Sequence, residues 1–169
     1  MTLSVSEREQ NLKQALAIML DELGDTPLQM GYFDSRSPSF AQIHSTTWVD
    51  LVHGGFTKVV AGSFHQPTGR GWRKAMQITD RINEPSFRNQ FAAFLAYLKR
   101  FVKGRQQDAL VDLRKAAKEL GIPFGWLCNA VESELVEHLC DGRQGPYWHS
   151  EQASGIVVVP RNFYMLPLP

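Results

Sequence analysis

Positively charged side chains concentrate in the middle of this sequence. Residues 51–105 contain ten Lys or Arg and two acidic residues, a net charge of +8, so the remaining residues sum to −7. Because Lys and Arg neutralise phosphates, this distribution favours an anionic partner such as nucleic acid. The competing interpretation is that the acidic ends fold back and neutralise the middle within one globule.

Nine residues in or near this region have side chains suited to contacts with DNA. Gln, Ser and Thr can hydrogen-bond to bases or phosphates, whereas basic side chains neutralise phosphates and give affinity without reading sequence. The candidate DNA-binding residues are Gln42, His44, Ser45, Thr46, Lys58, His65, Arg70, Arg73 and Lys74. An ordinary solvated basic face is the alternative interpretation of the same residues.

Residue spacing gives little support to a metal or catalytic site. Structural zinc sites pair their cysteines as C-x₂₋₄-C, a spacing that Cys128, His138, Cys140 and His149 do not provide, so both cysteines are predicted to be buried small hydrophobes. The sequence also has no Gly-rich phosphate loop, no G-x-S-x-G and no H-E-x-x-H motif. We therefore predict no catalytic residues, no metal and no cofactor, in a protein that is not an enzyme.

The candidate residues fall on a regular succession of predicted elements. Ser37-Pro38 is expected to begin a helix that runs to Val52, and Gly54-Gly55 to end it. Phe56 to Val60 is β-branched, and a polar turn would return the chain as a second strand, Phe64 to Gln66. A further helix is expected from Arg73 to Arg81.

This order resembles the second half of a winged-helix domain, in which a recognition helix, a wing hairpin and a closing helix follow one another. The phrase from Thr68 to Ala75 is similar to the T-x-x-G-x-x-A entry into the helix after the wing in many winged-helix regulators. The resemblance implies a DNA-binding protein of the kind that regulates transcription and binds phosphates through the wing.

A strong amphipathic helix is predicted near the N-terminus. Ser6 and Glu9 have the spacing of a capping box, five apolar residues follow at helical spacing, and Gly24 would end the helix. The apolar residues of this stripe are Leu12, Leu16, Met19, Leu20 and Leu23. After it, Pro27 would open a short helix through Leu28 and Met30, and residues 34–38 would form a loop.

The second half of the sequence is predicted to be mostly helical. The stretch from Phe87 to Lys103 has an aromatic face that is either core or, as a second possibility, a homodimer interface. Its terminal Lys and Arg complement the helix dipole, so they can be explained without any partner. Further helices are expected over Gln107 to Leu120, Phe124 to Val131 and Ser133 to Cys140.

A second winged-helix-like unit is suggested near the C-terminus. Leu113 to Val131 resembles a helix-turn-helix, and strands over Pro146 to His149 and Gly155 to Pro160 would form its wing. Its presumed recognition helix offers only Asn129 for reading bases, because Pro123, Phe124, Gly125, Trp126 and Cys128 cannot do so. We therefore expect a protein partner, rather than DNA, around Phe124 and Trp126.

Composition places the chain among ordinary globular proteins, since 43% of its 169 residues are hydrophobic and 21% are charged. No apolar run reaches the about 20 residues that span a bilayer, the first ten residues are polar, and two cysteines make no disulfide framework. A cytoplasmic setting follows as an expectation.

Together these patterns predict a mostly helical α+β protein. The expected organisation is a first winged-helix-like unit over 1–83, a linking amphipathic helix over 84–105, and a second unit over 106–169 with an apolar tail. The tail would dock on its own domain or be offered to a partner. Duplex DNA is the expected partner, and the alternative function is a protein-interaction or adaptor module on the same scaffold.

Overall fold

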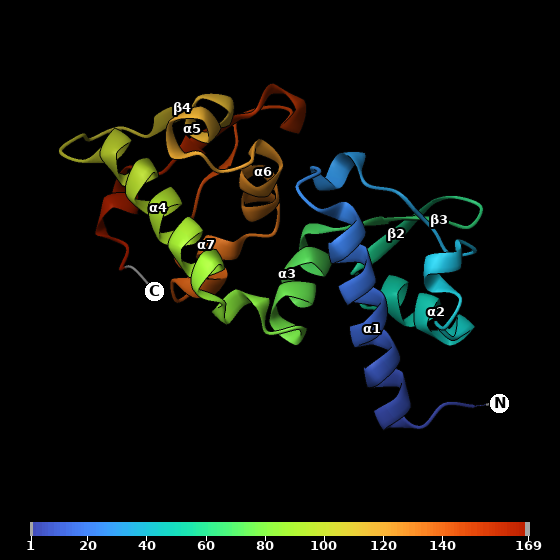
Figure 1. Cartoon of the computed structure of the whole chain (residues 1–169). Helices are drawn as coiled ribbons and strands as arrows, with labels where there is room; N and C mark the ends of the chain where they lie inside the picture. Colours follow the sequence, from blue (N-terminus) through green and yellow to red (C-terminus); the bar gives the residue numbers. More distant parts are fainter. Residues whose placement is uncertain (1, 168–169) are drawn as a thin grey trace. The chain divides into compact units, whose positions relative to one another are not determined.

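The computed structural model describes residues 2–167 and divides the chain into two compact units, Met1–Ile82 and Asn83–Pro169 (Figure 1). Each unit contains helices and one three-stranded antiparallel sheet. The predicted mostly helical α+β class is therefore confirmed.

The first unit begins with the predicted amphipathic helix, α1 (Val5–Leu23). Its capping box lies at Ser4 and Glu7, so the prediction of Ser6 and Glu9 is wrong. Both pairs have the same spacing, and capping at Ser4 lets two more residues join the helix. Gly24 ends α1 as predicted, and five residues form its buried face: Ala15, Leu16, Met19, Leu20 and Leu23.

The helix expected from Ser37 to Val52 is interrupted. Pro38–Phe40 forms only a 3₁₀ turn (η2), and the helix α2 is Ser45–His53. His44 breaks the run because its backbone is extended and its ring accepts a hydrogen bond from the Thr46 amide, which makes it the N-cap of α2. The apolar residues before His44 recur at helical spacing because they are buried, although they do not belong to one continuous helix. The short helix after Pro27 is confirmed as a 3₁₀ turn, η1 (Leu28–Met30).

The predicted hairpin is confirmed as β2 (Thr57–Ala61) paired with β3 (Phe64–Pro67). A third strand, β1 (Phe33–Asp34), pairs with β3 and gives the order β1-β3-β2, although Asp34 was expected in a loop. The Asp34 carboxylate accepts from the Ser63 hydroxyl at 2.6 Å and from the Arg36 amide at 3.0 Å. Asp34 therefore fastens β1 to the tip of the hairpin, and these hydrogen bonds hold the pKa of its carboxyl below the ordinary value.

The helix after the hairpin, α3 (Gly69–Ile78), begins four residues before the predicted Arg73 and ends before Arg81. Thr68 is its N-cap and accepts from the Gly71 amide at 3.0 Å. A Cβ atom at Gly71 would lie 2.0 Å from the Phe56 carbonyl oxygen. Only glycine therefore lets α3 start so close to β2.

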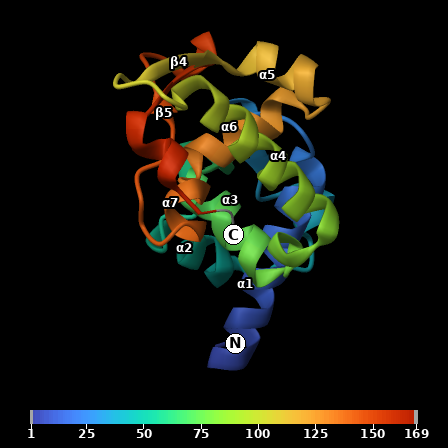
Figure 2. The same cartoon turned by 90° about the vertical axis from the view of Figure 1, so that its left-hand side faces the viewer.

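In the second unit, the predicted aromatic helix is present as α4 (Pro85–Val102; Figure 2). Its buried residues are Phe87, Phe91, Phe94, Leu95, Tyr97, Leu98 and Val102. The Trp126 ring lies 5.7 Å from Phe87 and 6.4 Å from Phe94, centre to centre. This aromatic face is core, so it is not free for the expected homodimer contact through Phe87–Lys103.

The helix predicted over Gln107–Leu120 is wrong in its first half. Ala109–Asp112 is a strand, β4, and α5 covers only Leu113–Leu120. Buried and less buried residues alternate along β4, which is the strand period, and pairing with β6 (Ile156–Val159) outweighs its weak helical pattern. β5 (Tyr147–Trp148) completes the order β4-β6-β5, which confirms the second predicted hairpin.

The remaining predicted helices are confirmed as α6 (Phe124–Glu132) and α7 (Leu135–Leu139), with Gly121 in the left-handed conformation at the end of α5. Short 3₁₀ turns follow at Gln152–Ser154 (η4) and Arg161–Met165 (η5). The tail packs on its own unit through Phe163 and Leu166, as expected, while Leu168 and Pro169 lie outside the described residues.

Both units follow the same order: helix, strand, helical segments, hairpin. In both sheets the first strand lies beside the third. The expected linking helix over 84–105 packs against strands and helices of the second unit. Among residues 2–167, none of the helices combines the length and the apolar character that crossing a bilayer requires.

The close approach at Gly71 predicts a large effect of one methyl group. Gly71→Ala should lower the free energy of unfolding by about 3 kcal/mol, because the new Cβ overlaps the Phe56 carbonyl. Gly62→Ala is the control, since Gly62 also has a special backbone (φ +53°) but no neighbouring atoms, and should cost about 1 kcal/mol. Urea unfolding of both variants tests this, and equal losses would contradict the account.

Candidate nucleic-acid interface

A chain of ring contacts places α2 against the first sheet. Phe33 of β1 meets Phe40 at 6.1 Å, Phe40 meets Trp48 of α2 at 5.0 Å, and Trp48 meets His65 of β3 at 4.6 Å between ring centres. Thr47 and Leu51 of α2 are buried beside this chain. One face of α2 is therefore fixed in the core, and the other is exposed.

His65, one of the predicted DNA-binding residues, is not exposed as expected. It is 6% exposed, with its Nδ1 atom 3.3 Å from the Thr57 hydroxyl. Only Phe64, the first residue of β3, is exposed, and the strand is buried from His65 to Pro67. Burial lowers the pKa of the His65 imidazole, which makes a phosphate-bound cation at this position unfavourable.

The polar candidates at the start of α2 lie together. Gln42, Ser45 and Thr46 are exposed, whereas His44 is half-buried. The Nδ1 atom of His44 lies 3.2 Å from the Thr46 amide and 2.9 Å from the Thr46 hydroxyl. Its role is therefore to cap α2, and the three exposed side chains remain available for hydrogen bonds to a ligand.

The basic candidates differ in their exposure. Lys58 and Arg70 are exposed, while Arg73 and Lys74 are half-buried on α3. The Arg70 guanidinium lies 5.5 Å from the centre of the Phe56 ring. Within residues 2–167, Lys58 and Arg70 form no ion pair with a carboxylate. These two side chains offer uncompensated charge beside the hairpin.

The exposed face of α2 and β2 also carries apolar side chains that the sequence did not single out. Val49 is 55% exposed, Val52 37%, Val59 53% and Val60 42%. We call these four residues the valine face. Val49 could have been noticed, because it lies away from the buried Thr47 and Leu51 of α2, whereas Val59 and Val60 are exposed because β2 is uncovered from Lys58 to Ala61.

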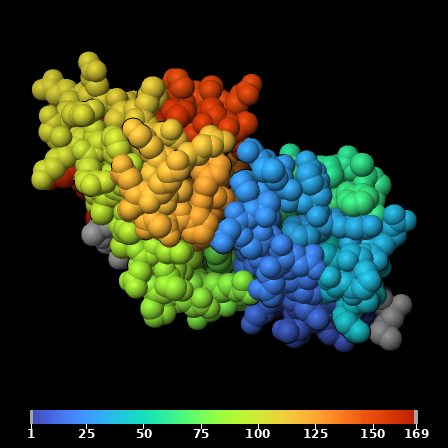
Figure 3. All heavy atoms as spheres, turned by 45° about the horizontal axis from the view of Figure 1, so that its top comes forward, coloured from blue at the N-terminus to red at the C-terminus, as the bar shows by residue number. Residues whose placement is uncertain are grey.

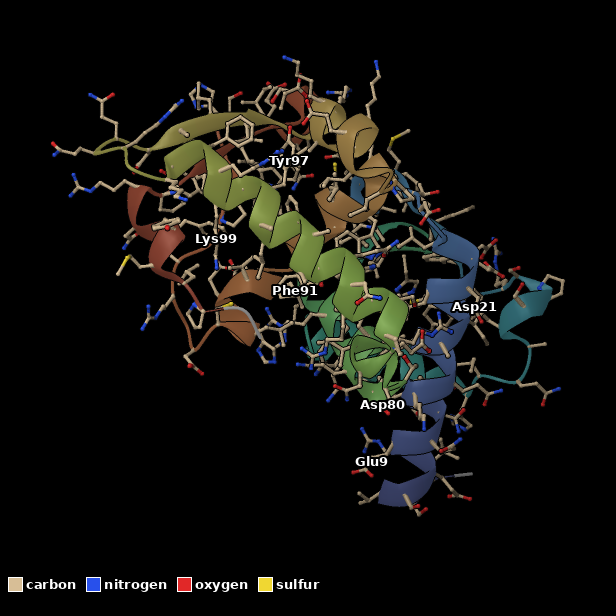
Figure 4. All side chains as sticks on the ribbon, turned by 60° about the vertical axis from the view of Figure 1, so that its left-hand side comes forward. Glu9, Asp21, Asp80, Phe91, Tyr97 and Lys99 are labelled. Carbon is tan, nitrogen blue, oxygen red and sulfur yellow. The ribbon has the colours of Figure 1, made fainter. Side chains whose placement is uncertain are left out.

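The positive charges of the middle region do not gather on a single surface. Five of the ten belong to each unit, and the two units contain eight basic and eight acidic, and ten basic and nine acidic, residues. Arg81 pairs with Asp21 of α1 at 2.7 Å, and Arg100 pairs with Glu119 at 3.7 Å (Figure 4 labels Asp21). Folding therefore neutralises part of the basic middle, as the competing interpretation expected.

The protein-binding patch expected around Phe124 and Trp126 is wrong. Trp126 is 7% exposed because it packs on the aromatic face of α4. Phe124 is half-buried, with the Arg114 guanidinium 4.5 Å from its ring centre. Asn129, the one residue suited to reading bases, is 1% exposed. The presumed recognition helix α6 is a core helix.

The described residues also hold no group of three or more His, Cys, Asp or Glu side chains that could ligate a metal ion. Cys128 and Cys140 are buried and reduced, as predicted. Burial raises the pKa of the Cys128 thiol to about 12, so this cysteine is unreactive near neutral pH.

Comparison of the chain with protein-family models, curated proteins and solved structures finds no match. The case for a function therefore depends on the residues themselves.

The buried His65 predicts a pH-dependent stability. Because its folded pKa is lowered, the unfolded chain binds the proton more readily, and stability should fall as pH drops through the ordinary value of about 6.5. His65→Gln removes this titration and keeps a polar group near Thr57. Unfolding free energies measured between about pH 5.5 and 7.5 should fall more steeply for the unmodified protein. Parallel curves would contradict the assignment.

Proposed function

We propose that this chain is a non-catalytic DNA-binding protein whose first winged-helix-like unit contacts duplex phosphates. The observation that carries the proposal is the pair of exposed cations, Lys58 and Arg70, which form no ion pair with a carboxylate of the described residues. The order of elements and the β1-β3-β2 sheet support the resemblance to a winged helix.

The position of the cations on α3 also supports a binding role. Arg70 lies in the first turn of α3, and Arg73 and Lys74 follow in the next turn. Positive charge near a helix N-terminus opposes the helix dipole, so Arg70 does not help α3 to form. The contact with the Phe56 ring orients the Arg70 guanidinium without cancelling its charge, so this charge remains available to a phosphate.

The site would give affinity without much sequence discrimination. Lys and Arg bind phosphates, which position a protein on DNA but carry no sequence information. Ser45 and Thr46 on α2 can add hydrogen bonds, but α2 has no Arg, Lys, Asn or Gln for bidentate contacts to bases. We therefore infer that binding is electrostatic and largely independent of sequence.

Charge reversal at the hairpin tests this proposal. The double variant Lys58→Glu/Arg70→Glu should weaken duplex binding by at least about tenfold and make the salt dependence shallower by about two in log–log slope, since each phosphate contact contributes roughly 0.9. Fluorescence anisotropy with a random-sequence duplex, at about 50 and 200 mM salt, measures both quantities.

The control is Gln10→Glu/Lys13→Glu/Gln14→Glu, which lowers the net charge by the same amount at exposed positions of α1 in the same unit. It should bind DNA nearly as well as the unmodified protein. An equal loss in both variants would mean that only net charge matters, and salt-independent binding or no binding would refute the proposal.

The second candidate function is a protein-interaction module, and the valine face favours it. Four exposed valines lie on two elements that contact each other, and exposed apolar side chains are more typical of a protein contact than of a phosphate contact. Under this alternative the winged-helix-like scaffold would bind a protein through α2 and β2.

A single substitution separates the two functions. Val49→Lys places a cation on the exposed side of α2, so it should strengthen duplex binding several-fold if α2 faces DNA. If the valine face binds a protein instead, the chain does not bind DNA, and Val49→Lys should not create duplex binding. Gln14→Lys is the control, because it adds the same charge at an exposed position of α1.

A further inference from the structure

A second group of cations lies in the second unit, around the short helix η5. They come from separate parts of the chain: the end of α4, the segment after it, the loop after α7, and η5 itself (Figure 3 shows the segment after α4 in yellow-green at the surface). The five cations, together with Tyr164, are called the η5 surface. They are Lys99, Lys103, Arg105, Arg143 and Arg161.

Several of these cations contact neutral groups of the protein. The Lys103 ammonium lies 5.8 Å from the centre of the Tyr164 ring. The Arg143 guanidinium lies 3.5 Å from the Met165 carbonyl oxygen, and the Arg161 guanidinium lies 3.5 Å from that of Gln106. Carbonyls and rings orient a cation but do not cancel its charge, so these side chains keep their positive potential.

The η5 surface rests on a fixed support. Phe163 is fully buried and Leu166 is 5% exposed, so η5 is packed against α4. Lys99, labelled in Figure 4, donates to the Leu166 carbonyl at 2.5 Å and ties α4 to the segment after η5. Tyr164 and Met165 nevertheless remain 43% and 72% exposed. The surface therefore offers cations and an aromatic ring at defined positions.

Nearby carboxylates offset only part of this charge. Asp108 accepts from the Arg161 amide at 2.8 Å, and Glu137 accepts from the Gly145 amide at 2.8 Å. Asp141 is the third acid close to this region. Two of the three carboxylates are engaged with backbone amides, and five cations outnumber them. The helix dipole of α4 explains Lys99 but not Arg143 or Arg161, which lie on other elements.

We infer that the η5 surface binds the phosphate backbone of nucleic acid. This inference rests on the proposed DNA-binding function and adds a second contact area, in the second unit. Cations held by four segments suit a chain of phosphates, and an exposed tyrosine can stack on an unpaired base. An anionic membrane fits less well, because stable attachment needs a larger apolar insertion than Met165 provides.

The test compares the unmodified full chain with three charge-reversal variants. Lys103→Glu/Arg161→Glu removes part of the η5 surface, Lys58→Glu/Arg70→Glu removes the hairpin cations, and a matched control changes two exposed lysines of α5, Lys115→Glu/Lys118→Glu. Thermal unfolding checks that each variant folds. Anisotropy is measured with a random duplex and with one of its strands, and co-sedimentation with vesicles that contain phosphatidylserine.

The η5 variant should lose at least about tenfold in affinity for nucleic acid, with a salt slope shallower by about two, while the α5 control stays near the unmodified value. A stronger effect on the single strand would identify base stacking on Tyr164. Loss of binding in the hairpin variant but not in the η5 variant would overturn this inference and leave the proposed function standing. The reverse pattern would support this inference and overturn the hairpin site. Binding to vesicles without binding to nucleic acid would overturn both.

Discussion

Aromatic packing of the helices against neighbouring elements determines which surfaces of this protein are exposed to a partner. In the first unit, the contacts from Phe33 through Phe40 and Trp48 to His65 fix one side of α2 and leave the other side exposed. In the second unit, Trp126 packs on Phe87 and Phe94 and draws α6 into the core. The helices α2 and α6 occupy equivalent places in the order of elements. Because their ring contacts differ, α2 keeps an exposed side whereas α6 is buried in the core.

The elements that could be predicted from sequence are those that depend on local signals. Hydrophobic period, helix-ending glycines and turn residues located both hairpins, α1, α4 and the turn at Gly121, because these signals are local. The strands β1 and β4 were missed, since both depend on pairing with residues far along the chain. The break before α2 was missed because a histidine cap is a rare signal.

The candidate site shows the same limit. Sequence indicated which residues were basic and polar, and Lys58, Arg70, Ser45 and Thr46 are indeed exposed. It could not show that His65 faces inward, because the face of β3 that is covered is set by Trp48 of α2. Net charge also could not locate the η5 cations, which come together only when η5 packs on α4. The sequence therefore predicted the chemical type of the candidate side chains, but it did not predict which of them lie together in the folded protein.

The central claim is that exposed cations beside the β2–β3 hairpin and around η5 contact phosphates. The most direct measurement is a titration of the isotope-labelled chain with duplex DNA, followed by amide chemical shifts in NMR spectra. The account predicts salt-sensitive shifts at the start of α2, at Lys58, at the first turns of α3, and at Lys103 and Arg161, with α5 unchanged. Shifts that leave Lys58, Lys103 and Arg161 unchanged, or no shifts at low salt, would contradict it.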